Sequence, residues 1–327
     1  MATPRATRRP ARTPKIIAKA PQVRCHVEMT SAFHIAISDD GRFVAGGGGV
    51  AVDAMDAVYG FDPSVRLWDA SSRTFLAPLE TPHVNQTRSS RISLSFLPGG
   101  HSLLTAGDDG LVIEWDVATQ TELRRFGREG AITCMGVSAD GEILVTGGSF
   151  EDGRLRMWSV REGRLSSTLE GSYDWGASAV AIDAARERVI SAGGGDGNSG
   201  VRVHDLSSGE ELRRIGRAAG GVHALSISPD GAWVVTGGRS TIGRIWSIDT
   251  GKRRVALDGK RGSYGVAFHP DDQRVLSTCE GALCIWDAET GALLHSVDGK
   301  GAAPLALSRD GRHAVTAGPR GLLYWDL

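Results

Sequence analysis

Few residues of this 327-residue chain stand at spacings that could do chemistry. The run from Gly195 to Gly200, Gly-Asp-Gly-Asn-Ser-Gly, formally fits the GxGxxG pattern of a dinucleotide site. Such a site needs a strand, a tight turn and then a helix, whose first amides face the pyrophosphate. Here strand-like residues flank the glycines on both sides, so the run predicts a hairpin loop. Asp196 and Asn198 offer two oxygen ligands, fewer than the roughly six to eight that calcium takes.

The other titratable residues also lack catalytic or metal-binding spacings. Asp39-Asp40 and Asp271-Asp272 are paired acids in turn sequences, where Asp suits the backbone geometry. The nine histidines show neither HxH nor HExxH spacing, the four cysteines show no CxxC, and no Ser or Cys stands in a nucleophile elbow. We therefore predict no catalytic residue, no cofactor site and no metal site.

The composition fits a soluble globular protein rich in tight turns. Apolar residues make up 41% of the chain and charged residues 23%, and there are 44 glycines. That glycine content is far above the usual share of roughly 7%. No apolar run approaches the roughly 18 residues that cross a membrane. No secretory signal is recognisable, so we expect a cytoplasmic protein with reduced cysteines.

The net charge of −1 is unevenly distributed, because residues 1–22 carry +6 without any acid and the remainder carries −7. Residues 1–14 are rich in Arg, Pro and Thr and have almost nothing to bury, which predicts a disordered basic arm. The body alone lacks the basic character of a nucleic-acid-binding domain. An arm that contacts nucleic acid or an anionic surface remains an alternative.

From about residue 15 onward, one strand sequence recurs seven times. It alternates large side chains and ends in Trp-Asp at Val65–Asp69, Val112–Asp116, Leu283–Asp287 and Leu322–Leu327, with looser copies ending at Ser159, Asp205 and Ser247. The Trp-equivalent positions are 68, 115, 158, 204, 246, 286 and 325, which are 39 to 47 residues apart. This period is the length of one four-stranded unit.

Each repeat has the same internal order of strands and turns. A short alternating strand leads to a turn such as Ser228-Pro229-Asp230-Gly231, and a second strand ends in small residues, as in Val235-Thr236-Gly237-Gly238. Pro presets φ early in such a turn, and Asp and Gly tolerate the positive φ that closes it. These features resemble WD40 repeats over residues 15–327. The resemblance implies one all-β domain, a seven-bladed WD40-type β-propeller.

The order of the strands also predicts how the ring closes. The last Trp strand, at Leu322–Leu327, is the third of its blade, and an outer strand does not follow it. The segment around Ala20–Val27 can supply that strand. We therefore predict that the N-terminal strand completes the last blade, which removes an exposed seam and favours a monomeric propeller.

In the WD40 family, a Gly-His pair, a Ser or Thr, an Asp before the Trp strand and the Trp form a buried hydrogen-bonded tetrad. Six residues before the Trp positions, only Asp62, Asp109 and Asp152 match, and we find no Gly-His pair in any repeat. The Ser or Thr partners are Thr105, Thr146, Ser191, Thr236 and Thr316. The resemblance therefore implies incomplete tetrads.

In this family, the loops before the first strand and between the second and third strands emerge on one face, and here these loops vary most. They mix aromatic residues with Arg, as binding hot spots do. We predict that this face binds a protein or peptide within a larger assembly. The candidate contact residues are Tyr59, Phe61, Arg88, Arg91, Tyr173, Trp175, His223, Arg261 and Tyr264. Trp175 is the strongest candidate, because a Trp in a Gly-flanked loop has no role in the repeat.

Several interpretations stay open at this point. The longest loop, Gly46–Pro63, carries apolar side chains that either contact a partner or cover the first blade. Nucleic-acid binding would use the basic arm with Arg88, Arg91, Lys260 and Arg261. A small-molecule sensor or propeller enzyme would need acids or histidines converging on the central channel, which the sequence does not indicate.

Overall fold

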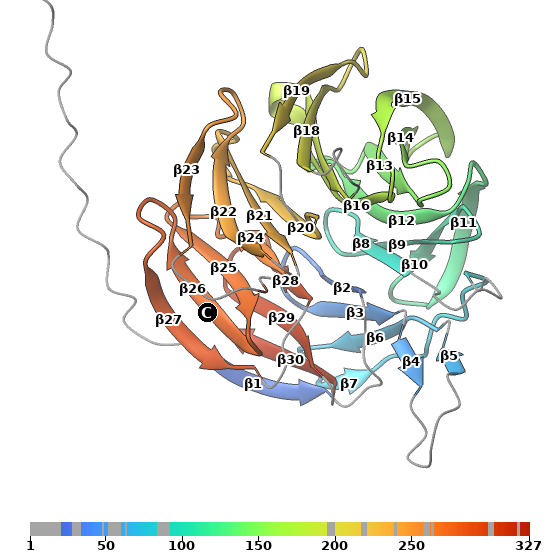
Figure 1. Cartoon of the computed structure of the whole chain (residues 1–327). Coiled ribbons are helices and arrows are strands. Elements are labelled where there is room, and N and C mark those ends of the chain that lie inside the picture. Colours follow the sequence, from blue (N-terminus) through green and yellow to red (C-terminus); the bar gives the residue numbers. More distant parts are fainter. Residues whose placement is uncertain are drawn as a thin grey trace, which may run out of the picture.

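The structure is a computed structural model of the whole chain. It describes residues 21–27, 34–47, 49–51, 60–62, 64–83, 92–194, 200–216, 221–238, 241–257, 262, 265–299, 304–318 and 321–327. These residues form seven four-stranded antiparallel sheets, which stand around a ring as blades (Figure 1). The all-β, seven-bladed propeller expected from the repeats is confirmed.

Each blade runs from an inner first strand to an outer fourth strand. Blade 1 holds β2 (His34–Ile37), β3 (Phe43–Gly47), β6 (Arg66–Asp69) and β7 (Thr74–Phe75). Blade 2 holds β8 (Ile92–Phe96), β9 (Ser102–Gly107), β10 (Leu111–Asp116) and β11 (Thr121–Gly127). Blade 3 holds β12 (Ile132–Val137), β13 (Ile143–Gly148), β14 (Arg154–Ser159) and β15 (Arg164–Ser172).

The second half of the ring repeats this arrangement. Blade 4 holds β16 (Ala177–Asp183), β17 (Arg188–Gly193), β18 (Gly200–Asp205) and β19 (Glu211–Ile215). Blade 5 holds β20 (Ala224–Ile227), β21 (Trp233–Gly238), β22 (Thr241–Ser247) and β23 (Arg253–Ala256). Blade 6 holds β24 (Val266–Phe268), β25 (Arg274–Cys279), β26 (Ala282–Asp287) and β27 (Leu293–Asp298). Blade 7 holds β28 (Leu305–Leu307), β29 (His313–Gly318), β30 (Gly321–Asp326) and β1 (Gln22–Val27).

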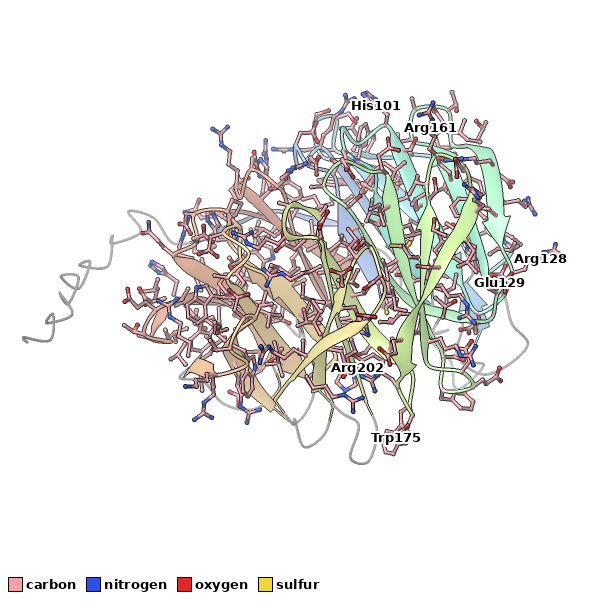
Figure 2. The ribbon with its side chains drawn as sticks, turned by 90° about the horizontal axis from the view of Figure 1, so that it is seen from above. His101, Arg128, Glu129, Arg161, Trp175 and Arg202 are labelled. Atoms are coloured by element: carbon pink, nitrogen blue, oxygen red, sulfur yellow. The ribbon has the colours of Figure 1, made fainter. Side chains whose placement is uncertain are left out.

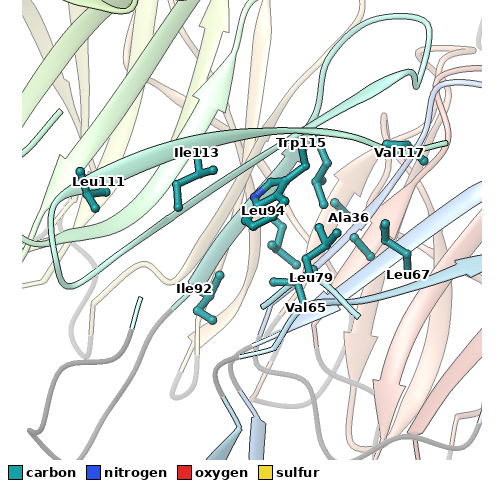
Figure 3. Close-up of a cluster of buried hydrophobic side chains, with 12 residues drawn as sticks. Ala36, Val65, Leu67, Leu79, Ile92, Leu94, Leu111, Ile113, Trp115 and Val117 are labelled. Atoms are coloured by element: carbon teal, nitrogen blue, oxygen red, sulfur yellow. The ribbon is translucent and has the colours of Figure 1, made fainter. Parts of the chain in front are cut away.

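The hydrophobic core is divided among the contacts between neighbouring blades, and each of the seven contacts has its own cluster of buried side chains. Between blades 1 and 2, Trp115 of β10 packs with Val65 and Leu67 (Figure 3). In six blades, the Trp of the third strand lies in this way against the preceding blade. Burying a large apolar side chain contributes roughly 1.5–3 kcal/mol, so the repeated Trp is a main source of contact between blades.

The ring closes as predicted, because β1 is the outer strand of blade 7 (Figure 1). It pairs antiparallel with β30, from Gln22 opposite Asp326 to Val27 opposite Leu322. The hydroxyl of Tyr324 in β30 also donates a hydrogen bond of 2.8 Å to the carbonyl of Gly41 in blade 1. Burial raises the pKa of this hydroxyl to about 12. Blade 7 is therefore fastened both to the N-terminal strand and to blade 1.

The long insertion of blade 1 contains a small ribbon of its own. Strands β4 (Gly49–Ala51) and β5 (Gly60–Asp62) pair with each other and belong to none of the blades (Figure 1). Residues 52–59, between them, lie outside the described residues. Whether this insertion contacts a partner or covers blade 1 therefore stays a prediction.

Candidate partner-binding surface

The antiparallel blades give the ring two different faces. The turns between first and second strands and between third and fourth strands lie at one end, which we call the turn face. The loops between second and third strands, and those that lead from one blade to the next, lie at the other end, which we call the loop face. Trp175 lies at the loop face, and His101 and Arg161 lie at the opposite end (Figure 2).

Blade 2 contains a complete hydrogen-bonded tetrad beneath the loop face. The indole Nε1 of Trp115 donates to Thr105 Oγ1 at 3.0 Å. Thr105 Oγ1 lies 2.8 Å from Nε2 of His83, and Nδ1 of His83 lies 2.9 Å from Asp109 Oδ1. The threonine hydroxyl accepts the indole proton and has its own proton available for Nε2 of His83, whose Nδ1 faces Asp109.

This tetrad corrects the expectation that all tetrads are incomplete, which is wrong for blade 2. His83 is fully buried, although it precedes the first strand of blade 2, in one of the loops that vary between repeats. Burial acts to raise the pKa of Asp109, but hydrogen bonds from His83 and from the backbone outweigh it and lower that pKa below its usual value. Pro82 stands where the family has the Gly of the Gly-His pair, so the motif does not show in the sequence as that pair.

Blade 4 replaces this arrangement with other side chains. His204 occupies the Trp position, is fully buried, and donates from Nε2 to the carbonyl of Glu170 in β15 at 2.9 Å. Ser191, which would bond the indole, instead shares a hydrogen bond of 2.9 Å with the hydroxyl of Tyr173. The guanidinium of Arg202 lies 4.6 Å from the centre of the Tyr173 ring and forms an ion pair with Glu211.

Tyr173 is therefore wrong as a predicted contact residue. Its side chain is only 2% exposed, and its hydroxyl is bound in the interior of blade 4. Burial raises the pKa of this hydroxyl far above its usual value, which keeps it neutral. Tyr173 helps to hold the loop that carries Trp175, and does not face a partner.

Blades 3, 5, 6 and 7 keep the bond between indole and hydroxyl, whereas blade 1 has Gly46 at the hydroxyl position. The donor and acceptor pairs are Trp158–Thr146, Trp246–Thr236, Trp286–Ser277 and Trp325–Thr316, at 2.8 to 3.0 Å. Ser277 was not among the Ser or Thr partners predicted from the sequence. In blade 3, Asp152 pairs with the guanidinium of Arg156, which takes the place of a histidine partner. These bonds fix the loop face from below while leaving the loops themselves free to differ.

Two exposed aromatic side chains stand out on the loop face. Among the described residues, Phe150 and Trp175 are the most exposed large hydrophobic side chains, at 73% and 67%. Phe150 lies between β13 and β14 of blade 3, and Trp175 lies in the turn that leads from blade 3 to blade 4. The two turns touch, because a Cβ on Gly176, which has a φ of +81°, would lie 2.9 Å from the carbonyl carbon of Ser149.

Trp175 is anchored by its backbone, and one edge of its largely exposed ring lies over Gly194. Its N–H points to the carbonyl of Gly194 at 3.4 Å. A Cβ on Gly194 would stand 3.6 Å from that of Trp175, so the start of the indole side chain lies over the end of blade 4. The exposed charges beside the pair are Glu151 and Asp174. The sequence singled out Trp175 but missed Phe150, which stands in an otherwise polar turn.

The remaining predicted contact residues are placed only in part. His223 is exposed at the start of blade 5, where its N–H bonds the carbonyl of Gly237 at 2.9 Å. Phe61 belongs to β5, but its side chain is not among the described groups. The others lie outside the described residues: Tyr59, Arg88, Arg91, Arg261 and Tyr264. Their role stays a prediction.

Within the described part of the chain, no group of three or more His, Cys, Asp or Glu side chains could hold a metal ion. No helix described there is both long enough and apolar enough to cross a membrane. The lowered carboxylate pKa values have structural causes. For Asp69, burial acts to raise the pKa, but hydrogen bonds from Arg42 and Ser71 lower it to about 2.

Comparison with known proteins agrees with the strand pattern and the tetrad of blade 2. The family described as WD domain, G-beta repeat matches residues 80–116, 120–159, 209–247 and 251–287. The chain belongs to the WD40 repeat family. The third strands of blades 1, 4 and 7 lie outside these matched segments, so the ring includes repeats that diverge from the family pattern.

Three curated relatives cover about two thirds of the WD40 chain. Cilia- and flagella-associated protein 52 of Bos taurus is 26% identical over 65% of the chain and 34% of its own length. Transducin beta-like protein 3 of Rattus norvegicus is 26% identical over 64% of the chain and 28% of its own length. Autophagy-related protein 16 of Arabidopsis thaliana is 21% identical over 72% of the chain and 45% of its own length. The chain thus spans between about a quarter and a half of these relatives.

Proposed function

We propose that this WD40 propeller is a non-catalytic scaffold that binds a protein or peptide partner through its loop face, as one component of a larger assembly. The exposed pair Phe150 and Trp175 carries the proposal. Both side chains are mostly exposed to solvent, and they stand on neighbouring turns of the ring. Large aromatic side chains that a fold leaves exposed together are typical of the anchors of an interface.

The surroundings of the pair support a protein partner. The exposed residues Glu151 and Asp174 are the sequence neighbours of Phe150 and Trp175, which suits an apolar anchor with a polar rim. Tetrad and Trp bonds fix the strands below, so little ordering entropy is lost on binding. One of the relatives is named for its association with cilia and flagella, which are large assemblies.

The test compares partners retained by wild-type protein with those retained by the double variant Phe150→Ala/Trp175→Ala. Affinity purification from the natural source and quantitative mass spectrometry identify them. Removing two anchor side chains weakens a protein interface by about 10–30-fold or more. We expect at least one wild-type partner to be lost.

The matched control is Phe75→Ala/Leu123→Ala, which removes exposed apolar side chains from the outer strands of blades 1 and 2. The control should retain all partners, and both double variants should keep the wild-type melting temperature. If the Phe150/Trp175 variant retains every partner at wild-type strength, the loop face is not the binding surface.

A further inference from the structure

A groove of about 420 Å³ opens between blades 3 and 4 on the turn face, opposite Trp175. From blade 3, residues at the start of β13, the end of β14 and the start of β15 line the groove. From blade 4, the residue before β17 and the residues just after β18 line it. The lining residues are Glu142, Ile143, Met157, Trp158, Ser159, Ser166, Glu187, Leu206 and Ser207. None of them takes part in the proposed loop-face site.

The groove lies at the blade contact where the repeated Trp is missing. Val189 pairs with His204 and packs in the cluster between blades 3 and 4, so His204 faces blade 3. Its imidazole is smaller than an indole and is turned to the carbonyl of Glu170. The contact between blades 3 and 4 therefore lacks the indole present in the other six, although the buried ring of Tyr173 belongs to its cluster.

The turn between β16 and β17 also departs from the other blades. A short 3-10 helix, Ala184–Arg186, replaces the Ser-x-Asp-Gly turn, and Glu187 follows it with a φ of 51°. This left-handed backbone is uncommon for a residue other than Gly, and sets the place of Glu187 at the rim. The missing Trp and the irregular turn thus both lie at the contact that holds the groove.

The chemistry of the groove is apolar at its floor and acidic at its rim. Ile143 and Met157 are half-buried and Leu206 is 9% exposed, so the floor offers aliphatic contact. The rim carries the exposed carboxylates of Glu142 and Glu187. Neither forms an ion pair or a side-chain hydrogen bond among the described residues, whereas nearby Glu162 is paired with Arg164.

We propose that this groove docks a short basic segment of a protein partner. One aliphatic side chain of the segment lies against Ile143, Met157 and Leu206, and Lys or Arg residues on either side pair with Glu142 and Glu187. Charge complementarity selects this occupant, because two unpaired carboxylates repel acidic peptides and nucleic acid and attract cations. The groove is thus a second docking site, independent of the loop face.

Methionine methyl NMR tests the proposal on the full chain. Met157 lies in the groove, and Met135 of β12 packs between blades 2 and 3, so it serves as an internal control. The probe is the peptide acetyl-Arg-Leu-Arg-amide, and the matched control is acetyl-Glu-Leu-Glu-amide. We expect the basic peptide to shift the Met157 methyl resonance in a saturable way and to leave Met135 unchanged.

Two variants separate the rim from the floor. Glu142→Gln/Glu187→Gln removes both exposed carboxylates and should weaken binding of the basic peptide by about 3–10-fold. Ser166→Tyr fills the mouth of the groove from an exposed position and should abolish the Met157 shift. Both should keep the wild-type melting temperature and the loop-face partners.

Three results would overturn the proposal. The basic peptide leaves Met157 unchanged at the highest concentration used, or the acidic peptide shifts it equally, or the Gln variant binds as tightly as wild type. The first result denies docking, and the other two deny that charge selects the occupant.

Discussion

In blade 2, a chain of hydrogen bonds runs from Trp115 through Thr105 and His83 to Asp109. In blade 4, His204 occupies the Trp position and bonds the neighbouring blade, while Tyr173 takes the hydroxyl of Ser191. Both blades satisfy the buried Ser or Thr hydroxyl. Only blade 2 does so with an indole that also fills the contact with the preceding blade.

The difference shows which contact between blades is less completely filled by side chains. The contact between blades 1 and 2 is filled by the indole of Trp115, whereas the contact between blades 3 and 4 retains a groove on the turn face. The exposed ring of Trp175 borders the same blade 4 on the loop face. Both proposed docking sites therefore adjoin the blade that departs furthest from the repeat.

The largest effect is expected for Thr105→Val in blade 2. The substitution preserves shape but leaves Trp115 Nε1 and His83 Nε2 buried without their partner. Each unsatisfied group costs about 1–3 kcal/mol, so the free energy of unfolding should fall by about 2–5 kcal/mol. Urea denaturation measures the loss. Thr168→Val, at an exposed position of β15, is the control, and an equal loss in both would mean that the tetrad does not stabilise blade 2.

A smaller effect is expected for Tyr173→Phe in blade 4. It removes one neutral hydrogen bond, to Ser191, and keeps the aromatic ring beneath Arg202. The free energy of unfolding should fall by about 1–3 kcal/mol, because the buried hydroxyl of Ser191 loses its partner. The same urea experiment measures it. A loss as large as that of Thr105→Val would show that blades 2 and 4 depend equally on their polar clusters.

The smallest effect is expected for His204→Gln, and it appears as a change in pH dependence. Burial lowers the pKa of His204 below its usual value of 6.5, so the unfolded chain binds the proton more readily. The stability contributed by the neutral ring is therefore complete above pH 6.5 and is lost as pH falls toward the folded pKa. For one proton the slope is at most roughly 1.4 kcal/mol per pH unit.

Denaturation curves at about pH 7, 6 and 5 measure this slope, which should be shallower in His204→Gln than in wild type. Asp109→Asn is the matched variant in blade 2. The pKa of Asp109 lies below 3.8, so its contribution is complete above that pH and is lost only as pH falls further. If His204→Gln keeps the full wild-type slope, protonation of His204 does not weaken blade 4 in mild acid.

The scaffold could be predicted from the sequence because it depends on repeated local patterns. The Trp strands fix the number of blades, and an unpaired third strand in the last blade requires an outer strand such as Gln22–Val27. The polar clusters were harder to predict, because their members come from segments far apart. His83 lies 22 residues before Thr105, and its direction depends on how the connecting loop enters the blade.

The surface could be predicted only in part, for a related reason. Trp175 stands out because the repeat does not need it, but the same reasoning also selected the neighbouring Tyr173, which points inward. Two residues in one turn can face opposite ways, and composition does not separate them. The groove was not predicted, because His204 at the Trp position and the irregular turn before β17 mark blade 4 as divergent without giving the volume left between two blades.

The pairing of β1 with β30 has a consequence for the order of folding. During synthesis, β1 emerges first and its partner about 300 residues later, which takes roughly 15–60 s at ordinary translation rates. Blades 1 to 6 can form in that interval, during which β1 has no partner strand. An unpaired strand can also join another chain. Dilute refolding therefore favours the closed ring, and crowded nascent chains favour exchange of β1 between neighbours.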